Sequence, residues 1–232
     1  MKKKKQRHRR TKLSKKREKN IAVFFDLDKT LVKFNTAVRW GRFILFKNKL
    51  PLSFILTCSL YGTLYALKLY DFSKMLTKLW KTMENQDAKV ILKLTKELYS
   101  EPLKHIYPDM KMILDSHRKK GHKIIIITQT FDFIAEIFAK KLKADDFASS
   151  EAEVKKGIFT GKVNPCSAKK KDVYVKHFQK KYKLDLKNSY AYSDNIRDLP
   201  MLKDVGHASV VNPKKDLREF AIKHHWEIDM VG

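Results

Sequence analysis

The sequence has too few cysteines to support a disulfide-linked fold or a zinc cluster. Its 232 residues include two, Cys58 and Cys166, which lie far apart in the chain. Neither belongs to a CxxC pair or to a Cys/His spacing that is typical of zinc ligands. We therefore expect reduced thiols, buried or inert, in an intracellular protein.

Acidic residues are also scarce, since 25 Asp and Glu stand against 51 Lys and Arg and leave a net charge of +26. The excess is densest in residues 1–20, which hold twelve Lys or Arg and, with Glu18 as their one acid, a net charge of +11. Like charges at this density repel one another, so we predict a disordered basic arm. The arm either contacts nucleic acid or an anionic membrane weakly through phosphate charge, or has no dedicated partner. The sequence implies no obligate protein partner.

Long hydrophobic runs of the kind that a signal peptide or a clear membrane span needs are lacking. Residues 21–25 are apolar, but Asp26 ends this run after five residues. Residues 50–67 are uncharged over 18 residues, yet they contain Pro51, Gly62 and several hydroxyl side chains. A single span there would put two strands of one sheet on opposite sides of a membrane. We interpret this segment as a cap helix or helical hairpin in a cytoplasmic protein, with peripheral membrane contact as the alternative.

Short apolar runs rich in β-branched residues alternate with helical patterns after residue 20. Four consecutive isoleucines within residues 123–128 suggest a strand that is buried on both faces, as central parallel strands are. The alternation predicts an α/β fold, a Rossmann-like parallel sheet with helices on both faces. The predicted strands cover residues 21–25, 123–128, 189–193 and 208–212, with a hairpin over residues 147–163 that turns at Gly157 and Gly161.

Residues 34–106 carry no strand signal and separate the first strand from the next. Apolar side chains recur at helical spacing over residues 72–83 and 91–98. We therefore predict a helical cap inserted after the first strand. The predicted organisation is a basic arm over residues 1–20, a core formed by residues 21–33 and 107–232, and a cap insert over residues 34–106.

Two carboxylates, Asp26 and Asp28, follow the first strand at its carboxyl end, where open α/β sheets bind ligands. Charges this close are costly unless a cation or a proton compensates them, which favours a metal ion. In phosphoryl transfer the first carboxylate can attack phosphorus, while the second protonates the leaving oxygen and later deprotonates water. A charged loop after a strand is the alternative interpretation of this pair alone.

Other predicted strands also end in residues of suitable chemistry. Asp194 and Asp198 follow the strand at residues 189–193, and a Mg²⁺ ion between Asp26 and Asp194 would have the oxygen ligands that it prefers. Thr128 ends the isoleucine strand, where its hydroxyl and the following backbone N–H groups can hold phosphate oxygens. The counter-charge for a phosphoryl group would come from one of Lys169, Lys170 and Lys171, unless all three are ordinary surface residues.

Four motifs, taken in order, resemble those of the haloacid dehalogenase (HAD) superfamily. They are DLDKT at residues 26–30, Thr128, a lysine before a helix, and SDNIRDLPML at residues 193–202. The match is to subfamily IB, the phosphoserine-phosphatase-like branch, in which a helical cap follows the first motif, and it extends over about residues 21–226. The resemblance implies a HAD fold and a Mg²⁺-dependent phosphatase that works through an aspartyl-phosphate intermediate.

The resemblance also implies individual roles. Asp26 would be the nucleophile, Asp28 the general acid and base, and Lys171 the cation that pairs with phosphate and nucleophile. Lys171 is preferred because apolar residues then follow at helical spacing, while Lys170 stays the alternative. The other implied residues are Thr128, Gln129 and Asn195 for the substrate, Asp26, Asp194 and the backbone carbonyl of Asp28 for Mg²⁺, and Asp198 and Thr30 in support.

Several positions depart from the phosphoserine enzymes of this branch. Asn35 stands where those enzymes usually carry Glu, Gln129-Thr130 replaces a common Gly-Gly pair, and Arg197 replaces a frequent Asn. These departures argue against phosphoserine, and we predict a small phosphorylated metabolite as substrate. Two alternatives stay open, namely a lipid phosphate hydrolysed at a membrane and a nucleic-acid-binding protein that uses the basic arm on a phosphatase scaffold.

Basic residues are frequent where the cap begins. They would favour a substrate with more negative charge than one phosphate, through steering and direct pairing. Ordinary surface lysines and arginines are the alternative. The residues concerned are Lys33, Arg39, Arg42, Lys47 and Lys49.

Overall fold

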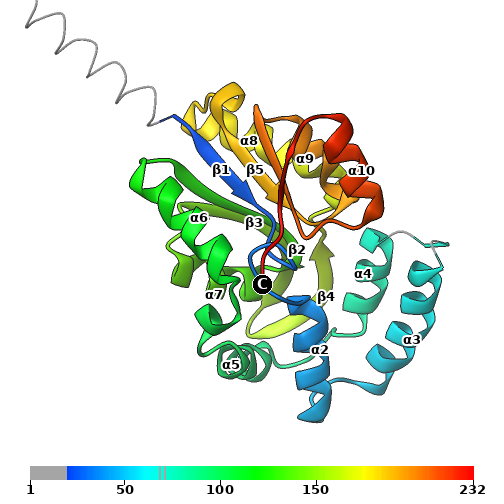
Figure 1. Cartoon of the computed structure of the whole chain (residues 1–232). Coiled ribbons are helices and arrows are strands. Elements are labelled where there is room, and N and C mark those ends of the chain that lie inside the picture. The colour runs from blue at the N-terminus through cyan, green and yellow to red at the C-terminus, as the bar shows by residue number, and fades with distance from the viewer. Residues whose placement is uncertain (1–19, 68, 71) are drawn as a thin grey trace, which may run out of the picture.

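A computed structural model describes residues 20–67, 69–70 and 72–232, so that residues 1–19 of the predicted basic arm lie outside the described residues. Within these ranges seven strands form one sheet in the order β4-β3-β2-β1-β5-β6-β7 (Figure 1). The strands are β1 (Ala22–Phe25), β2 (Lys123–Phe131), β3 (Asp146–Lys155), β4 (Ile158–Asn164), β5 (Tyr190–Ser193), β6 (His207–Val211) and β7 (Glu227–Asp229).

β1 lies at the centre of the sheet, between β2 and β5, and all four of its side chains are buried. It pairs in parallel with both neighbours, as the apolar character of residues 21–25 predicts. The parallel pairing continues to β3, β6 and β7, whereas β4 is antiparallel to β3. The three-residue strand β7 was not predicted, because Glu-Ile-Asp at a sheet edge carries no apolar run.

Helices cover both faces of the sheet, which confirms the predicted fold class. Val23 and Phe25 point to the face covered by α6 and α7, whereas Ala22 and Phe24 point to the face covered by α8, α9 and α10 (Figure 1). These helices are α6 (Pro108–Lys119), α7 (Asp132–Leu142), α8 (Lys171–Tyr182), α9 (Leu199–Lys203) and α10 (Lys215–Lys223). Short 3-10 turns are η1 (Pro102–His105), η2 (Ala168–Lys170), η3 (Leu186–Asn188) and η4 (Ile196–Asp198).

Four further helices separate β1 from α6 in the sequence: α2 (Thr36–Phe46), α3 (Leu52–Ala66), α4 (Phe72–Lys81) and α5 (Ala88–Leu98). The apolar segment at residues 50–67 forms the single helix α3, so the helical-hairpin alternative is wrong. Among the described residues, the helices fall short of the length and apolarity that crossing a bilayer requires.

The chain enters and leaves this group of helices at one place. Residues 31–33 run antiparallel to residues 105–107: Lys33 N–H donates to His105 O over 3.1 Å, and Tyr107 N–H donates to Leu31 O over 2.9 Å. A cap whose two connections to the core run side by side can fold as a compact insert. We therefore propose residues 34–106 as the cap insert and residues 21–33 with 107–232 as the core.

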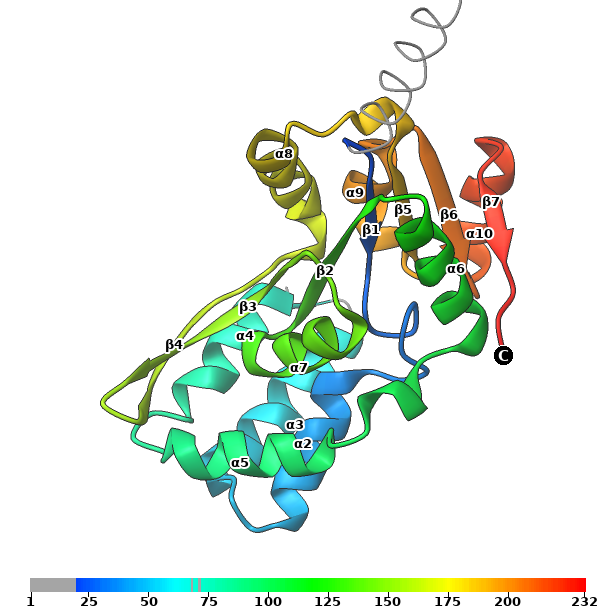
Figure 2. The same cartoon turned by 90° about the vertical axis from the view of Figure 1, so that its left-hand side faces the viewer.

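The predicted hairpin is formed by β3 and β4, and it attaches the cap to the core a second time (Figure 2). Asn85 N–H donates to Phe159 O and Ala88 N–H to Gly157 O, both over 2.9 Å. Gly157 occupies the turn with a φ of +79°. Gly161 was predicted there too but lies within β4, where a Cβ atom would come within 2.9 Å of Glu84 Cβ.

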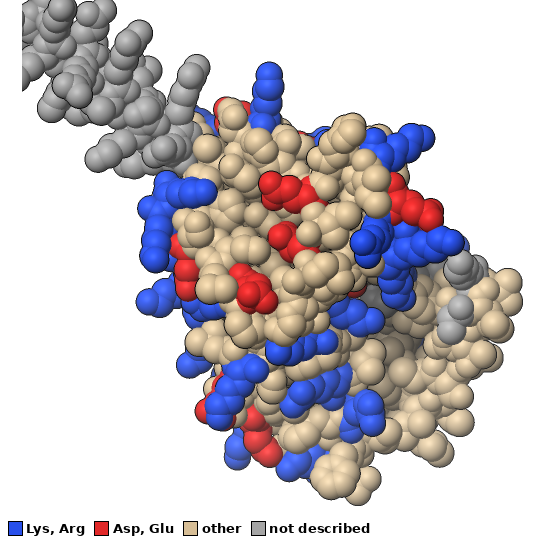
Figure 3. All heavy atoms as spheres, in the orientation of Figure 1, with Lys and Arg blue, Asp and Glu red and all other residues tan. Residues whose placement is uncertain are grey.

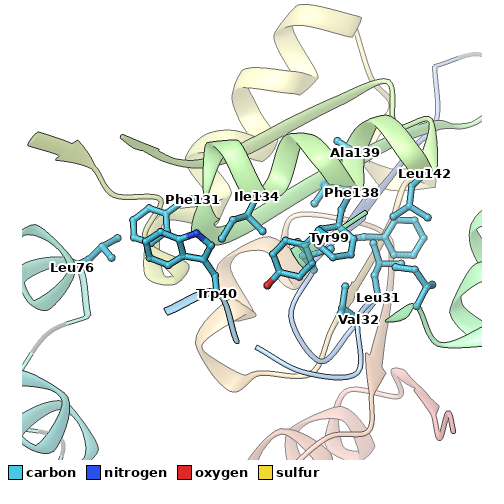
Figure 4. Close-up of a cluster of buried hydrophobic side chains, with 14 of the residues drawn as sticks. Leu31, Val32, Trp40, Leu76, Tyr99, Phe131, Ile134, Phe138, Ala139 and Leu142 are labelled. Carbon is cyan, nitrogen blue, oxygen red and sulfur yellow. The ribbon is translucent and has the colours of Figure 1, made fainter. Parts of the chain in front are cut away.

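Aromatic side chains fill the junction between the cap and α7 (Figure 4). The ring centroids of Trp40 and Phe131 are 5.5 Å apart, and Trp40 Nε1 donates to Thr95 Oγ1 over 2.8 Å. Tyr99 packs edge-on against Phe138 and donates its hydroxyl to a backbone carbonyl of α2 over 2.6 Å. These contacts fix α2 and α5 on the core and so position the residues that follow β1.

Candidate active site

A buried ion pair lies at the carboxyl end of the central strand. Asp26 directly follows β1, and its N–H donates to Tyr192 O of β5 over 3.0 Å. Lys171 begins α8, where its Nζ donates to Asp26 Oδ1 over 2.5 Å and to Asp198 Oδ2 over 2.8 Å. The side chains of Lys171, Asp26 and Asp198 are 1%, 10% and 4% exposed. One cation is therefore held between two carboxylates away from water.

The three consecutive lysines at 169–171 have different environments. Lys171 is buried, whereas Lys169 and Lys170 are exposed, so the structure brings Lys171 to the carboxylates. Burial lowers the pKa of Lys171, but the charges of Asp198 and Asp26 outweigh burial and hold that pKa above its usual value. Lys171 is therefore a permanent positive charge at this site.

Asp26 itself is short of compensating charge. Burial raises the pKa of the Asp26 carboxyl well above its usual range, and the positive charge of Lys171 opposes this shift. The negative charges of Asp198, Asp194 and Asp28 raise the same pKa further. Four carboxylates thus face one buried lysine, and this arrangement favours a second cation.

Asp28 ties the loop after β1 to the cap. Its Oδ1 accepts the N–H of Thr36, the first residue of α2, over 2.9 Å, and Thr36 Oγ1 in turn lies 2.8 Å from Thr130 Oγ1. Lys29, which lies between Asp28 and Thr30, adopts a left-handed backbone conformation with φ +61°. Burial raises the pKa of Asp28 to about 6, while the Thr36 N–H bond limits the rise. Asp28 is partly exposed, so it can exchange protons with a substrate or water.

Thr30 links the first acidic loop to the one that follows β5. Its Oγ1 accepts the N–H of Asp194 over 3.0 Å and lies 3.5 Å from Asp194 Oδ1. Burial and the nearby charge of Asp198 raise the pKa of Asp194 to about 6. Thr30 therefore connects the loop that follows β1 with the loop that follows β5.

Ser193, which was not among the predicted site residues, holds Asp198 in place. Its Oγ donates to Asp198 Oδ2 over 2.6 Å and accepts the N–H of Asn195 over 3.2 Å. Ser193 is the first residue of the SDNIRD motif, and this position in the sequence could have identified it as a site residue. Asn195 Oδ1 accepts the N–H of Arg197 over 3.1 Å, so this oxygen caps the η4 turn.

β2 does not end at Thr128, as the sequence pattern predicted, but continues to Phe131 through a register irregularity opposite β3. Thr128 is fully buried, and its Oγ1 accepts the N–H of Thr130 over 3.2 Å. The carbonyl of Gln129 accepts the hydroxyl of Ser150 over 2.8 Å. The bulged backbone lies beside the end of β1, because Phe25 pairs with Ile126.

Three of the five basic residues near the start of the cap have partners of their own. Arg39 Cζ lies 4.5 Å from the ring centroid of Phe34, and Lys33 Nζ lies 5.5 Å from that of Tyr107. Lys47 forms an ion pair with Glu97 over 3.1 Å. Arg42 and Lys49 are exposed. A role for these residues in binding a highly charged substrate stays a prediction.

The oxygen chemistry of the site fits Mg²⁺. Asp26 and Asp194 follow the adjacent strands β1 and β5. Each adds negative charge to the site, and Lys171 alone does not compensate both. In the part of the chain that the structure describes, no three His, Cys, Asp or Glu side chains are grouped to hold a metal. A site of two carboxylates and the Asp28 carbonyl would suit Mg²⁺, which keeps several water ligands.

A protein-family model, described as haloacid dehalogenase-like hydrolase, matches residues 23–203. This range contains the acidic loops after β1 and β5, the end of β2 and Lys171. The chain belongs to this family.

Relatives of this HAD hydrolase include a putative hydrolase of Mycobacterium leprae, 30% identical over 89% of the chain and 71% of the relative. A phosphoserine phosphatase of Mycobacterium tuberculosis is 29% identical over 89% of the chain and 70% of the relative. These matches confirm the resemblance to the phosphoserine-phosphatase-like branch.

Solved structures agree with the fold of the hydrolase. A Bordetella pertussis protein of unknown function has a TM-score of 0.82 at 19% identity, over 91% of this chain and 98% of that one. A probable phosphoserine phosphatase of Vibrio cholerae has a TM-score of 0.67 at 16% identity, over 86% and 59%. At these identities the likeness concerns the fold.

Proposed function

We propose that this hydrolase is a Mg²⁺-dependent phosphatase that cleaves phosphomonoesters through an aspartyl-phosphate on Asp26. The observation that carries the proposal is the buried contact of Asp26 with Lys171, with Asp28 on the same loop. A carboxylate held against a fixed cation is positioned to attack phosphorus, because the cation attracts the phosphoryl oxygens as well. The phosphoserine-phosphatase-like relatives support the same chemistry.

In the first step Asp26 attacks phosphorus through its other oxygen, Oδ2, and the bond from phosphorus to the ester oxygen breaks. Asp28 donates its proton to that oxygen, and the alcohol leaves. A pKa of about 6 suits this task, because near neutral pH Asp28 can be either protonated or ionised. Asp26 then carries the phosphoryl group as a mixed anhydride.

In the second step Asp28, now ionised, takes a proton from water. The water oxygen bonds to phosphorus, the bond between phosphorus and Asp26 breaks, and inorganic phosphate leaves. Both carboxyl groups return to their starting protonation states, so the cycle consumes one water and one phosphomonoester. The Thr36 N–H bond holds Asp28 in reach throughout.

The remaining site residues bind and position. Lys171 pairs with the phosphoryl group and with Asp26, and Asp198, fixed by Ser193, holds Lys171. Thr128, Gln129 and Asn195 are proposed to contact the phosphate or the substrate. Asp26, Asp194 and the carbonyl of Asp28 would hold Mg²⁺, which when bound neutralises phosphoryl charge.

For the substrate we propose a small phosphorylated metabolite other than phosphoserine. Asn35, in the place of the usual Glu, is the N-cap of α2, where its Oδ1 accepts the N–H of Val38 over 2.9 Å. Because Asn35 is uncharged, it offers no negative charge to the amino group of phosphoserine. A cytoplasmic location stays a prediction, and so does nucleic-acid binding through residues 1–20, most of which lie outside the described residues.

The test is phosphate release from a panel of sugar phosphates, nucleotides, phosphoserine, histidinol phosphate and phosphocholine, in Mg²⁺ and in EDTA. We expect release from at least one member in Mg²⁺, its loss in EDTA, and its loss in Asp26→Asn, whose amide is nearly isosteric but a poor nucleophile. Asp172→Asn, on the partly exposed first turn of α8, is the control. Turnover by Asp26→Asn at the wild-type rate would overturn the proposal.

A further inference from the structure

α3 has no charged side chain, yet much of it is exposed. Residues 52–66 contain no Asp, Glu, Lys or Arg, although Ser53, Ser59 and Thr63 are among the exposed residues. α3 packs against α4 and buries Phe54 to 5% exposure. On its other side Leu52, Leu56 and Leu60 are 69%, 63% and 58% exposed. Because they are four residues apart, they form one row along the helix.

Two further exposed leucines follow the end of the helix. Leu67 is 62% exposed and Leu69 is 71% exposed. We call Leu52, Leu56, Leu60, Leu67 and Leu69 the α3 face. In Figure 3 the lobe that contains α3 and α4 is almost entirely tan, whereas the adjoining surface carries many basic side chains. An exposed apolar row of this length is unusual for a protein surface and marks an interaction site.

The neighbouring helices differ in how apolar their exposed sides are. α5 exposes Lys89, Lys93 and Lys96, and α4 exposes Lys78 and Lys81. Most of the apolar side chains of these two helices are turned inward, as in ordinary amphipathic helices. α2, in contrast, exposes Val38, Leu45 and Phe46 to 60%, 40% and 81%. The exposed apolar surface of the cap therefore lies on α2 and α3.

We propose that the α3 face binds the interfacial layer of an anionic bilayer. Charge favours this occupant over a second copy of the chain. A chain of net charge +26 repels its own copies, whereas it is attracted to anionic headgroups. Arg42 and Lys49, which are exposed before the start of α3, add positive charge to this part of the cap.

The dimensions of α3 agree with a helix that lies flat in the interface. Its 15 residues extend about 22 Å, too short to cross a hydrocarbon core of about 30 Å. Tyr61 and Tyr65 lie in its second half, partly exposed, and the ring of Tyr70 is 5.0 Å from that of Tyr61.

The side of α3 that is turned away from the exposed leucines contacts the core. Arg197 Cζ lies 5.2 Å from the ring centroid of Tyr65, and Arg197 belongs to the η4 turn that also carries Asp198. The end of α3 therefore touches the rim of the site. Membrane binding goes beyond the proposed phosphatase activity and does not depend on it.

The test is sedimentation of the full chain with vesicles of phosphatidylcholine alone and of phosphatidylcholine with phosphatidylglycerol. We expect binding to the anionic vesicles and a loss of at least about tenfold in partitioning for Leu56→Gln with Leu60→Gln. The matched control is Val173→Gln with Ile222→Gln, which are 56% and 59% exposed on α8 and α10. Its partitioning should change by less than about twofold.

Three results would overturn the proposal. The first is a wild-type chain that stays in solution with anionic vesicles. The second is equal binding by the Leu56→Gln, Leu60→Gln variant, which would place the binding in residues 1–20. The third is a wild-type dimer in light scattering that becomes a monomer in this variant, which would make the face a contact between copies. Circular dichroism verifies that the variants are folded, and none of these measurements requires turnover.

Discussion

Lys171 Nζ lies 2.5 Å from Asp26 Oδ1 although the two residues are 145 positions apart in the sequence. Lys170, one position earlier, is exposed. The difference arises because α8 begins at Lys171 and its first turn is directed at the end of β1, whereas Lys170 still belongs to the preceding 3-10 turn. Two neighbouring lysines of identical chemistry thus provide a matched pair of substitutions.

Lys171→Met should lower kcat by at least about a hundredfold, whereas Lys170→Met should leave it unchanged within about twofold. Removing the buried cation leaves Asp26 and Asp198 facing each other without compensation, so the thermal midpoint of Lys171→Met should also fall. Phosphate release and differential scanning fluorimetry measure the two effects. Similar kinetics for both variants would show that Lys171 does not act on the phosphoryl group.

Mg²⁺ should raise the thermal midpoint of the wild-type chain, because an ion that binds the folded state stabilises it. The rise should be much smaller in Asp194→Asn, which loses one of the two proposed carboxylate ligands. Asp172→Asn, which removes a partly exposed acid on α8, should respond to Mg²⁺ as the wild type does. The same rise in all three proteins would exclude Asp194 as a ligand.

His117 should make the fold less stable in acid. It is 5% exposed, with Nδ1 2.9 Å from His122 Nδ1 and Nε2 3.1 Å from the Tyr192 hydroxyl. Burial, reinforced by the charge of His122, lowers its pKa to about 4 from an ordinary value of 6.5. Between these two values the unfolded chain binds a proton that the folded chain does not. Stability should therefore fall as the pH drops from about 7 to about 4, by up to about 3 kcal/mol from this residue.

Urea unfolding at several pH values over this range measures the effect. His117→Gln should flatten the profile, because glutamine does not titrate. The exposed His225→Gln should keep the wild-type slope. An unchanged slope in His117→Gln would assign the acid sensitivity to other groups.

Trp40 should be a main source of stability at the junction of cap and core. Trp40→Ala removes a side chain that is 1% exposed and should cost about 3–5 kcal/mol in the free energy of unfolding. Trp40→Phe keeps ring packing against Phe131 but loses the bond to Thr95 Oγ1, so its cost should be smaller, about 1–2 kcal/mol. Denaturant unfolding measures both, and the exposed Arg42→Ala serves as control. An equal cost for Arg42→Ala would contradict this role.

Local patterns in the sequence were sufficient for most of the sheet and for the lysine of the site. The apolar run before Asp26 and the four isoleucines predicted β1 and most of β2, because fully buried strands need apolar residues on both faces. The spacing after Lys171 favoured the lysine that the structure brings to Asp26, and Val175 and Phe178 in that spacing are buried. Of the two thiols that were predicted to be buried or inert, Cys166 is buried, whereas Cys58 is exposed on α3, where its inertness stays a prediction.

The sequence did not reveal the contacts that fix the acids. Thr30 bonds to Asp194 across 164 positions, and Thr36 contacts Thr130 across 94. Periodicity reports which face of an element is buried, but it does not report which polar groups on different elements meet. The bulge after Thr128 was missed for a similar reason, because its cause lies in the pairing with β3 and not in β2 itself.

The cap and the core are attached unequally along their boundary. Backbone hydrogen bonds join them where residues 31–33 meet 105–107 and where the β3–β4 hairpin meets residues 85–88. At α3 a guanidinium contacts a ring, an interaction worth about 0.5–1 kcal/mol at a partly exposed site. Among the described residues, α3 has no backbone hydrogen bond to the core. α3 can therefore be displaced while both sets of backbone bonds between cap and core stay intact.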